Sequence, residues 1–99
     1  MVRIQTVCGF GLGSSLMLKM NIDTILKDNS IRAETFCGDV ASCTSNDCSV
    51  IFISRDLGDR IKDRTKVPVV IIDNFMDKDE VRTKVLDYFS GLEKEGENE

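Results

Sequence analysis

The sequence contains no histidine, no tryptophan and only one proline. Without histidine, no mixed cysteine–histidine zinc site can form. The four cysteines stand at positions 8, 37, 43 and 48, and no two of them form a Cys-x-x-Cys pair. A site made of all four cysteines is the one zinc arrangement left open. The composition therefore indicates neither a metal nor an organic cofactor.

Long apolar runs and excess positive charge are also missing. No window approaches the roughly 18 consecutive apolar residues that a membrane span needs. Arg3 and Gln5 interrupt the only apolar run near the N-terminus, so no secretory signal is expected. The net charge of −4 argues against a nucleic-acid surface. We expect a cytoplasmic protein whose thiols are reduced.

The 99 residues suffice for one domain, expected over residues 1–92 with an acidic, disordered tail over 93–99. Apolar runs alternate with helical patterns, which favours an α/β fold with a parallel sheet covered on both faces. We predict a Rossmann-like three-layer sandwich with four parallel strands in the order 2-1-3-4. The expected strands are 2–7, 31–36, 49–54 and 67–72, and the expected helices are 14–28, a short one within 55–63, and 78–92.

The helix expected over residues 14–28 has an apolar stripe made of Leu18, Ile22, Ile25 and Leu26. Three further apolar residues, Leu16, Met17 and Met20, fall outside this stripe. The favoured interpretation is that they belong to the core of a helix packed from more than one side. The alternative is an apolar rim on which a partner protein docks.

The stretch Cys8-Gly9-Phe10-Gly11-Leu12-Gly13-Ser14-Ser15 lies where the first strand ends and the first helix begins. Its three alternating glycines permit φ > 0 and a close approach of the main chain to a ligand. Its N–H groups and the helix N-terminus can form an anion site, with the serines as helix caps. A thiol beside such a site has a lowered pKa and is nucleophilic. The pattern indicates phosphate carried on sulfur, and the alternative is a tight turn with a buried, inert cysteine.

This stretch resembles the phosphocysteine loop of enzyme IIB components of bacterial phosphoenolpyruvate-dependent sugar phosphotransferase systems. The form Cys-Gly-x-Gly-x-Gly-Ser-Ser is most similar to the ascorbate type, with the galactitol type next. The resemblance implies that Cys8 takes phosphate from a phosphohistidine on a soluble IIA protein and passes it to a sugar held by a membrane IIC protein. It implies phosphate contacts from the rest of the loop, namely Gly9, Phe10, Gly11, Leu12, Gly13, Ser14 and Ser15.

Two other functions stay open. Low-molecular-weight tyrosine phosphatases have a similar Cys-x5-Arg-Ser loop, but Ser14 stands where their arginine would be. Asp73 or Asp77 could act as a phosphatase acid, although a turn residue and a helix cap are the simpler roles. A redox or binding module would pair Cys8 with Cys37 or Cys43.

Accessory roles near the loop are less defined. Arg55 follows the third strand and is a candidate for holding a phosphate or a partner carboxylate. Residues 37–48 are predicted to form a loop that could rim the site.

Overall fold

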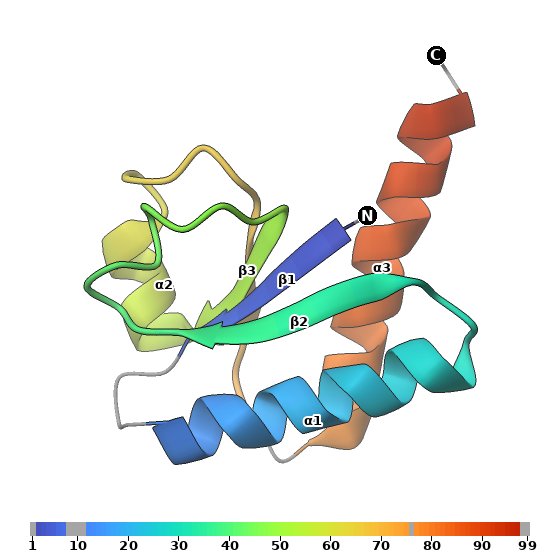
Figure 1. The fold of residues 1–99 in the computed structure, drawn as a ribbon, viewed down its shortest axis with the longest axis horizontal. Helices are drawn as coiled ribbons and strands as arrows, with labels where there is room; N and C mark the ends of the chain where they lie inside the picture. Colours follow the sequence, from blue (N-terminus) through green and yellow to red (C-terminus); the bar gives the residue numbers. More distant parts are fainter. Residues whose placement is uncertain (1, 8–11, 76, 98–99) are drawn as a thin grey trace.

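The computed structural model describes residues 2–7, 12–75 and 77–97, with the main chain only for residues 12–15, 56 and 92–97 (Figure 1). Strands and helices alternate along this chain in the predicted manner. In chain order, they are β1 (Val2–Val7), α1 (Leu12–Asp28), β2 (Ala33–Gly38), β3 (Val50–Ser54), α2 (Arg55–Ile61), β4 (Val69–Ile72) and α3 (Lys78–Glu97).

The four strands form one parallel sheet in the order β2-β1-β3-β4, which confirms the predicted topology. Val7 of β1 is paired with Ile53 of β3, and Ile53 is paired in turn with Ile71 of β4. The carboxyl ends of the strands therefore meet at one edge of the sheet. In open α/β sheets, this edge is where ligands bind.

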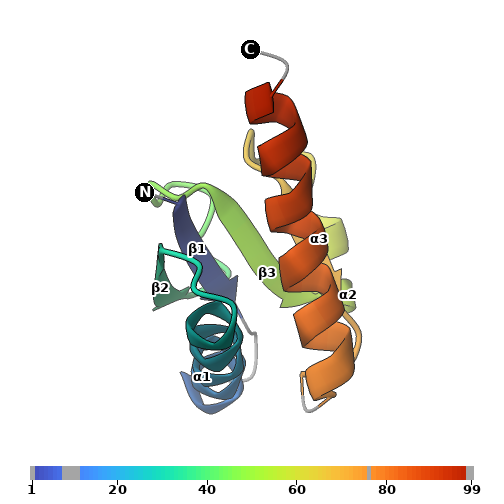
Figure 2. The ribbon, with the colours of Figure 1, turned by 90° about the vertical axis from the view of Figure 1, so that its right-hand side faces the viewer.

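Helices cover both faces of the sheet (Figures 1 and 2). Helices α1 and α3 lie side by side on one face, where their apolar stripes join Ile4 and Phe52 in a single buried cluster. Helix α2 contributes Ile61 to a smaller cluster on the opposite face. Strand β3 is fully buried from Val50 to Ile53, as expected for a central strand covered on both sides. The arrangement is the predicted three-layer sandwich.

A buried glutamine in β1 holds the segment that follows β2. The side chain of Gln5 is fully buried; its Nε2 donates to the carbonyl of Cys43 at 3.0 Å, and its Oε1 accepts from Asn46 at 2.7 Å. A Cβ built on Gly38 would lie 1.8 Å from Gln5 Oε1. Any larger residue at this position would therefore clash with the buried amide of Gln5. Satisfying a buried amide in this way avoids a large desolvation cost.

The observed bounds of β2 correct the prediction for residues 31–36 and for the start of the 37–48 loop. The strand begins at Ala33 and continues through Cys37 and Gly38, which pair with the last two residues of β1. Strand β1 has the predicted bounds, whereas β3 begins at Val50 and β4 at Val69, both later than predicted. Pairing along the full length of β1 decides where β2 ends, and the small polar residues of the sequence do not show this.

The apolar stripe of α1 is buried as predicted, since Leu18 and Ile22 are fully inaccessible. The favoured interpretation of the other three apolar residues is wrong. Leu16, Met17 and Met20 keep 49, 43 and 60% of their surfaces exposed. Helix α1 packs on the sheet and on α3 but is open on the side that carries these residues.

The third helix is longer than predicted. The sequence placed its end at Leu92 and an acidic tail over 93–99, whereas α3 continues to Glu97. Residues 93–97 are mostly glutamate and lysine, which have high helix propensity. None of the described helices is both long and apolar enough to cross a membrane.

Candidate functional site

The candidate site lies at the carboxyl edge of the sheet, where β1 leads into α1. Val7, the last residue of β1, is fully buried beside β3, and α1 begins at Leu12. The nucleophile predicted from the sequence, Cys8, lies outside the described residues, together with Gly9, Phe10 and Gly11. Both ends of this connection are therefore fixed at the edge where the topology predicts ligand binding.

Helix α1 begins two residues earlier than the sequence indicated. Leu12 and Gly13 belong to its first turn, and Ser14 and Ser15 are its third and fourth residues. The prediction that these serines cap the helix is therefore wrong. The first four N–H groups of a helix have no partner within it, so the main chain of Leu12–Ser15 presents donors to an anion. No acidic residue stands in this turn to repel one.

Arg55 lies at the same edge of the sheet, but its side chain is already paired. Its Nε donates to Asp73 Oδ1 at 2.7 Å, and its Nη2 donates to Asp73 Oδ2 at 3.1 Å. Asp73 directly follows β4, which lies on the opposite side of β3 from β1. The pair connects the ends of β3 and β4. The guanidinium of Arg55 is therefore bonded to a residue that follows β4, not to one that follows β1. The sequence did not indicate this partner.

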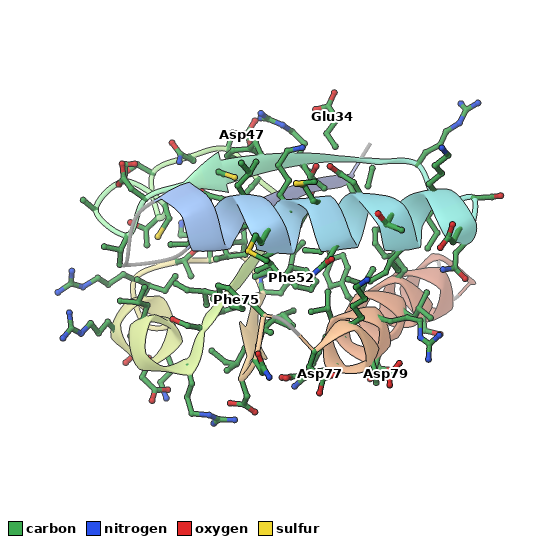
Figure 3. The ribbon with its side chains drawn as sticks, turned by 90° about the horizontal axis from the view of Figure 1, so that it is seen from below. Glu34, Asp47, Phe52, Phe75, Asp77 and Asp79 are labelled. Carbon is green, nitrogen blue, oxygen red and sulfur yellow. The ribbon has the colours of Figure 1, made fainter. Side chains whose placement is uncertain are left out.

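Other carboxylates near this edge are also engaged. Glu80 accepts hydrogen bonds from the main-chain N–H groups of Asp73 at 2.7 Å and Asn74 at 3.0 Å. Asp77, at the start of α3 (Figure 3), accepts from the N–H groups of Asp79 and Glu80. Asp77 therefore has the predicted role of helix cap.

The hydrogen bonds from Arg55 hold the pKa of Asp73 below its usual range, and the positive charge of the arginine adds to this effect. A carboxyl group with a lowered pKa is ionised at neutral pH and has no proton to donate. The geometry therefore argues against Asp73 as the acid of a phosphatase.

The Arg55–Asp73 pair leads to a direct test by titration. Replacing Arg55 with glutamine is expected to raise the Asp73 pKa toward its ordinary value, measured by NMR of the side-chain carboxyl carbon. Because the folded-state pKa is below the unfolded value of about 3.9, the contribution of the pair to stability is present above that pH and lost as the pH falls through the folded-state pKa. Arg60→Gln, on the exposed side of the same helix, is the matched control and should leave the Asp73 pKa unchanged. An Asp73 pKa equal in Arg55→Gln and the parent chain would contradict this assignment.

The three described cysteines, Cys37, Cys43 and Cys48, are free thiols. Burial, the largest cause, raises the pKa of Cys43 and also that of Cys48. Cys43 is fully buried in the cluster beneath α2. A buried thiol with a raised pKa is a poor nucleophile, which disfavours the exchange of Cys8 with Cys43. Within the described ranges, no group of three cysteine, aspartate or glutamate side chains could hold a metal ion.

The exposed residues Leu16, Met17 and Met20 form an apolar patch on α1, here called the α1 patch. They share one side of the helix because residues three and four positions apart, such as Met17 and Leu16 relative to Met20, lie close together on its surface. Leu16 follows Ser15 directly, so the patch borders the first turn of α1 and thus the candidate site. Clustered exposed apolar side chains commonly mark surfaces that bind other proteins.

Comparisons with known proteins agree with the observed fold. The family model described as "PTS system, Lactose/Cellobiose specific IIB subunit" matches residues 3–86. A solved structure with the same fold is the lactose-specific IIB component domain of the phosphoenolpyruvate:carbohydrate phosphotransferase system from Streptococcus pneumoniae. It has 14% sequence identity and a TM-score of 0.61, and the match covers 94% of this chain and 95% of that one. A search of curated proteins found no match.

Proposed function

Because the chain belongs to the family of lactose/cellobiose-specific IIB subunits of the phosphotransferase system, we propose that it carries a phosphoryl group on Cys8. Membership makes the chain a phosphoryl-transfer component of a sugar phosphotransferase system, and such components work with IIA and IIC partners. Beyond family membership, we propose that the sulfur atom of Cys8 holds the phosphate. We place this reaction in the cytoplasm, where a soluble IIA protein can reach the chain.

The observation that supports Cys8 is its position between the end of β1 and the first turn of α1. Cys8 follows Val7, the last residue of β1, and α1 begins at Leu12. The N–H groups of a helix N-terminus lower the pKa of a nearby thiol and stabilise negative charge. The three other cysteines are less suitable because they lie in β2 or in the segment between β2 and β3.

In the proposed first step, the Cys8 thiolate attacks the phosphorus of a phosphohistidine on the IIA protein. The S–P bond forms, the P–N bond breaks, and the imidazole leaves with the electron pair. In the second step, a sugar hydroxyl attacks the phosphorus, the P–S bond breaks, and the hydroxyl proton passes to a base outside this chain or to water. The chain has no histidine, so the donor imidazole comes from the partner. The loop from Gly9 to Ser15 would orient the phosphoryl oxygens and offset their charge, which is the main requirement of phosphoryl transfer.

A carrier fits the residues better than a phosphatase. The position six residues after Cys8 is Ser14, so the arginine that clamps the transition state of phosphatases is missing. Arg55 does not replace it, because its guanidinium is bonded to Asp73. Asp73 is bonded to Arg55, which lowers its pKa, and Asp77 has the role of a helix cap.

The comparisons do not support the ascorbate or galactitol type that the loop sequence favoured. The family match instead leads us to propose a sugar of the lactose or cellobiose class as acceptor. The difference has a physical reason, because the loop binds phosphate, which is common to every sugar substrate of these systems. Its residues therefore carry little information on the sugar.

We further propose that the α1 patch is where the IIA protein docks to deliver its phosphate. Met20 keeps 60% of its surface exposed and stands one turn beyond Leu16, close to the site but outside the loop. A Met20→Glu substitution is expected to slow transfer from the phosphorylated IIA protein about tenfold, because docking would desolvate a charge. The rate is measured by rapid quench at limiting donor.

The control is Ser90→Glu, which adds the same charge at an exposed position of α3. It should transfer phosphate at the parent rate. Equal rates for Met20→Glu and the parent chain would contradict docking at the α1 patch.

The proposed function itself is tested by incubating the chain with a phosphorylated IIA protein and measuring its intact mass. The expected result is the gain of one phosphate. A chain that gains none from a donor known to phosphorylate another IIB protein would contradict the proposal.

A further inference from the structure

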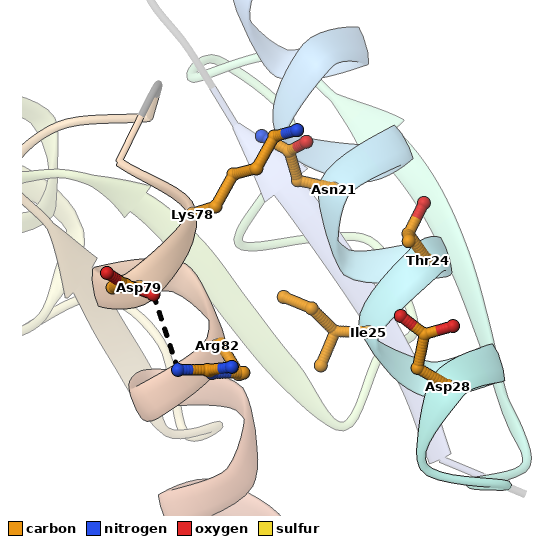
Figure 4. Close-up of a pocket in the computed structure, with 7 residues that line it drawn as sticks. All are labelled: Asn21, Thr24, Ile25, Asp28, Lys78, Asp79 and Arg82. Atoms are coloured by element: carbon orange, nitrogen blue, oxygen red, sulfur yellow. Dashed lines mark hydrogen bonds and ion pairs between the residues drawn. The ribbon is translucent and has the colours of Figure 1, made fainter.

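A groove lies between α1 and α3 (Figure 4). Its volume is about 200 Å³, which is small for a ligand site and suits a compact molecule. The lining side chains come from segments far apart in the sequence. They are Asn21, Thr24, Ile25, Asp28, Lys78, Asp79 and Arg82.

The α1 wall of this groove presents hydrogen-bond acceptors. Asn21 Nδ2 donates to the carbonyl of Phe75 at 3.2 Å, and Thr24 Oγ1 donates to the carbonyl of Met20 at 3.1 Å. These bonds use donor groups, so Asn21 Oδ1 and Thr24 Oγ1 remain as acceptors. Asp28 adds a carboxylate one turn beyond Thr24. A ligand facing this wall needs hydroxyl or N–H groups that can donate hydrogen bonds.

The α3 wall presents two cationic side chains, Lys78 and Arg82, and one carboxylate, Asp79. Lys78 is the first residue of α3, and Arg82 stands one turn later, near the positive end of the helix dipole. Arg82 is bonded to Asp79 at 3.3 Å, the one interaction marked among the seven side chains in Figure 4. Lys78 extends across the groove toward Asn21. A ligand facing this wall needs an anionic group.

Apolar surface lies between the two walls. Ile25, only 8% exposed, points into the groove and offers its side chain to the C–H face of a ring. The groove thus combines acceptors on one side, a lysine and an arginine partly offset by Asp79 on the other, and one apolar contact. This combination matches a sugar phosphate, whose hydroxyls donate hydrogen bonds and whose phosphate accepts them.

We propose that this groove binds a phosphorylated sugar, with its phosphate on Lys78 and on the Arg82 nitrogens that are not bonded to Asp79, and its hydroxyls on Asn21, Thr24 and Asp28. This inference rests on the proposed function, under which a phosphorylated sugar is the product of the transfer reaction. The groove would then be a product-sensing site away from Cys8. Helix α1 connects the two, because its first turn borders the loop and its later turns form one wall.

Binding is tested by NMR on the ¹⁵N-labelled, unphosphorylated chain, titrated with glucose 6-phosphate and with galactose 6-phosphate. At least one is expected to give saturable shifts in the amides of residues 21–28 and 78–82. Glucose, galactose and inorganic phosphate are expected to bind at least tenfold more weakly. No shifts with either sugar phosphate, shifts confined to residues 12–15, or equal affinity for inorganic phosphate would each overturn the proposal.

A matched pair of variants assigns the anion contact. Lys78→Ala is expected to weaken sugar phosphate binding about tenfold or more, because a charge-assisted hydrogen bond is lost. Lys27→Ala removes the same charge from an exposed position of α1 outside the groove and should bind as the parent does. Equal losses in the two variants would overturn the assignment. No phosphate donor is present in these titrations, so their failure leaves the question of phosphate on Cys8 untouched.

Discussion

Replacing Cys8 with serine is expected to abolish phosphorylation of the chain by its IIA donor. A thiol has a pKa near 8.5, and the positive end of a helix lowers this value, so the thiolate is available at neutral pH. A serine hydroxyl is a weak nucleophile unless an adjacent base activates it, and this chain has no histidine to do so. Intact-mass measurement after incubation with a phosphorylated donor should show no phosphate on the variant.

The matched control is Cys48→Ser. Cys48 Sγ accepts a hydrogen bond from Gln5 at 3.5 Å, and a serine oxygen can accept the same bond. Cys48 precedes the start of β3, so it lies at the edge of the sheet opposite the candidate site. Phosphorylation of this variant should match the parent chain. A Cys8→Ser chain that still gains phosphate would exclude Cys8 as the carrier.

Replacing Gly11 with valine is expected to lower the rate of phosphorylation about a hundredfold or more while the fold persists. Gly11 lies outside the described residues, so this expectation follows from the sequence. A valine at this position restricts φ and places a side chain where the loop N–H groups are proposed to meet phosphate. Losing one well-placed donor to a transition-state anion lowers rates of this kind by about a hundredfold to a thousandfold. The measurement is the single-turnover rate of transfer from the IIA protein.

Gly91→Val provides the matched control for this substitution. Gly91 lies in α3, and a Cβ built there meets no atom within 4 Å. Both variants should unfold at denaturant concentrations close to that of the parent, and only Gly11→Val should transfer slowly. A Gly11→Val chain with the parental rate would contradict an anion-binding loop.

The succession of strands and helices along the chain and the main core were predictable from the sequence because they depend on hydrophobic periodicity. Val50–Ile53 is a continuous apolar run, which predicts a strand buried on both faces, and this strand is central. Leu18 and Ile22 recur at helical spacing and are fully buried. In both cases, the pattern of side chains alone determines which surface is removed from water.

Other features depend on contacts that no local pattern contains. The end of β2 at Gly38 follows from pairing with β1 and from the space that the Gln5 side chain occupies. The exposure of Met17 and Met20 follows from where α1 packs, and apolar composition wrongly favoured a buried position.

The candidate phosphate loop is a prediction from the sequence, made possible because its chemistry is local. Cysteine, alternating glycines and a helix start occur within one short stretch, so residue type and order were enough to indicate a phosphate loop. The pairing of Arg55 with Asp73 joins the ends of two strands. The groove joins residues of α1 and α3 that are about fifty to sixty positions apart along the chain. Such sites require the fold before they can be recognised.

The central claim is that the sulfur of Cys8 carries the phosphate. It is tested most directly by phosphorylating the chain with its IIA donor and locating the phosphate by mass spectrometry of the resulting peptides at neutral pH. The account predicts a single phosphate on Cys8. A phosphate found instead on Ser14, Ser15 or any other residue would contradict it.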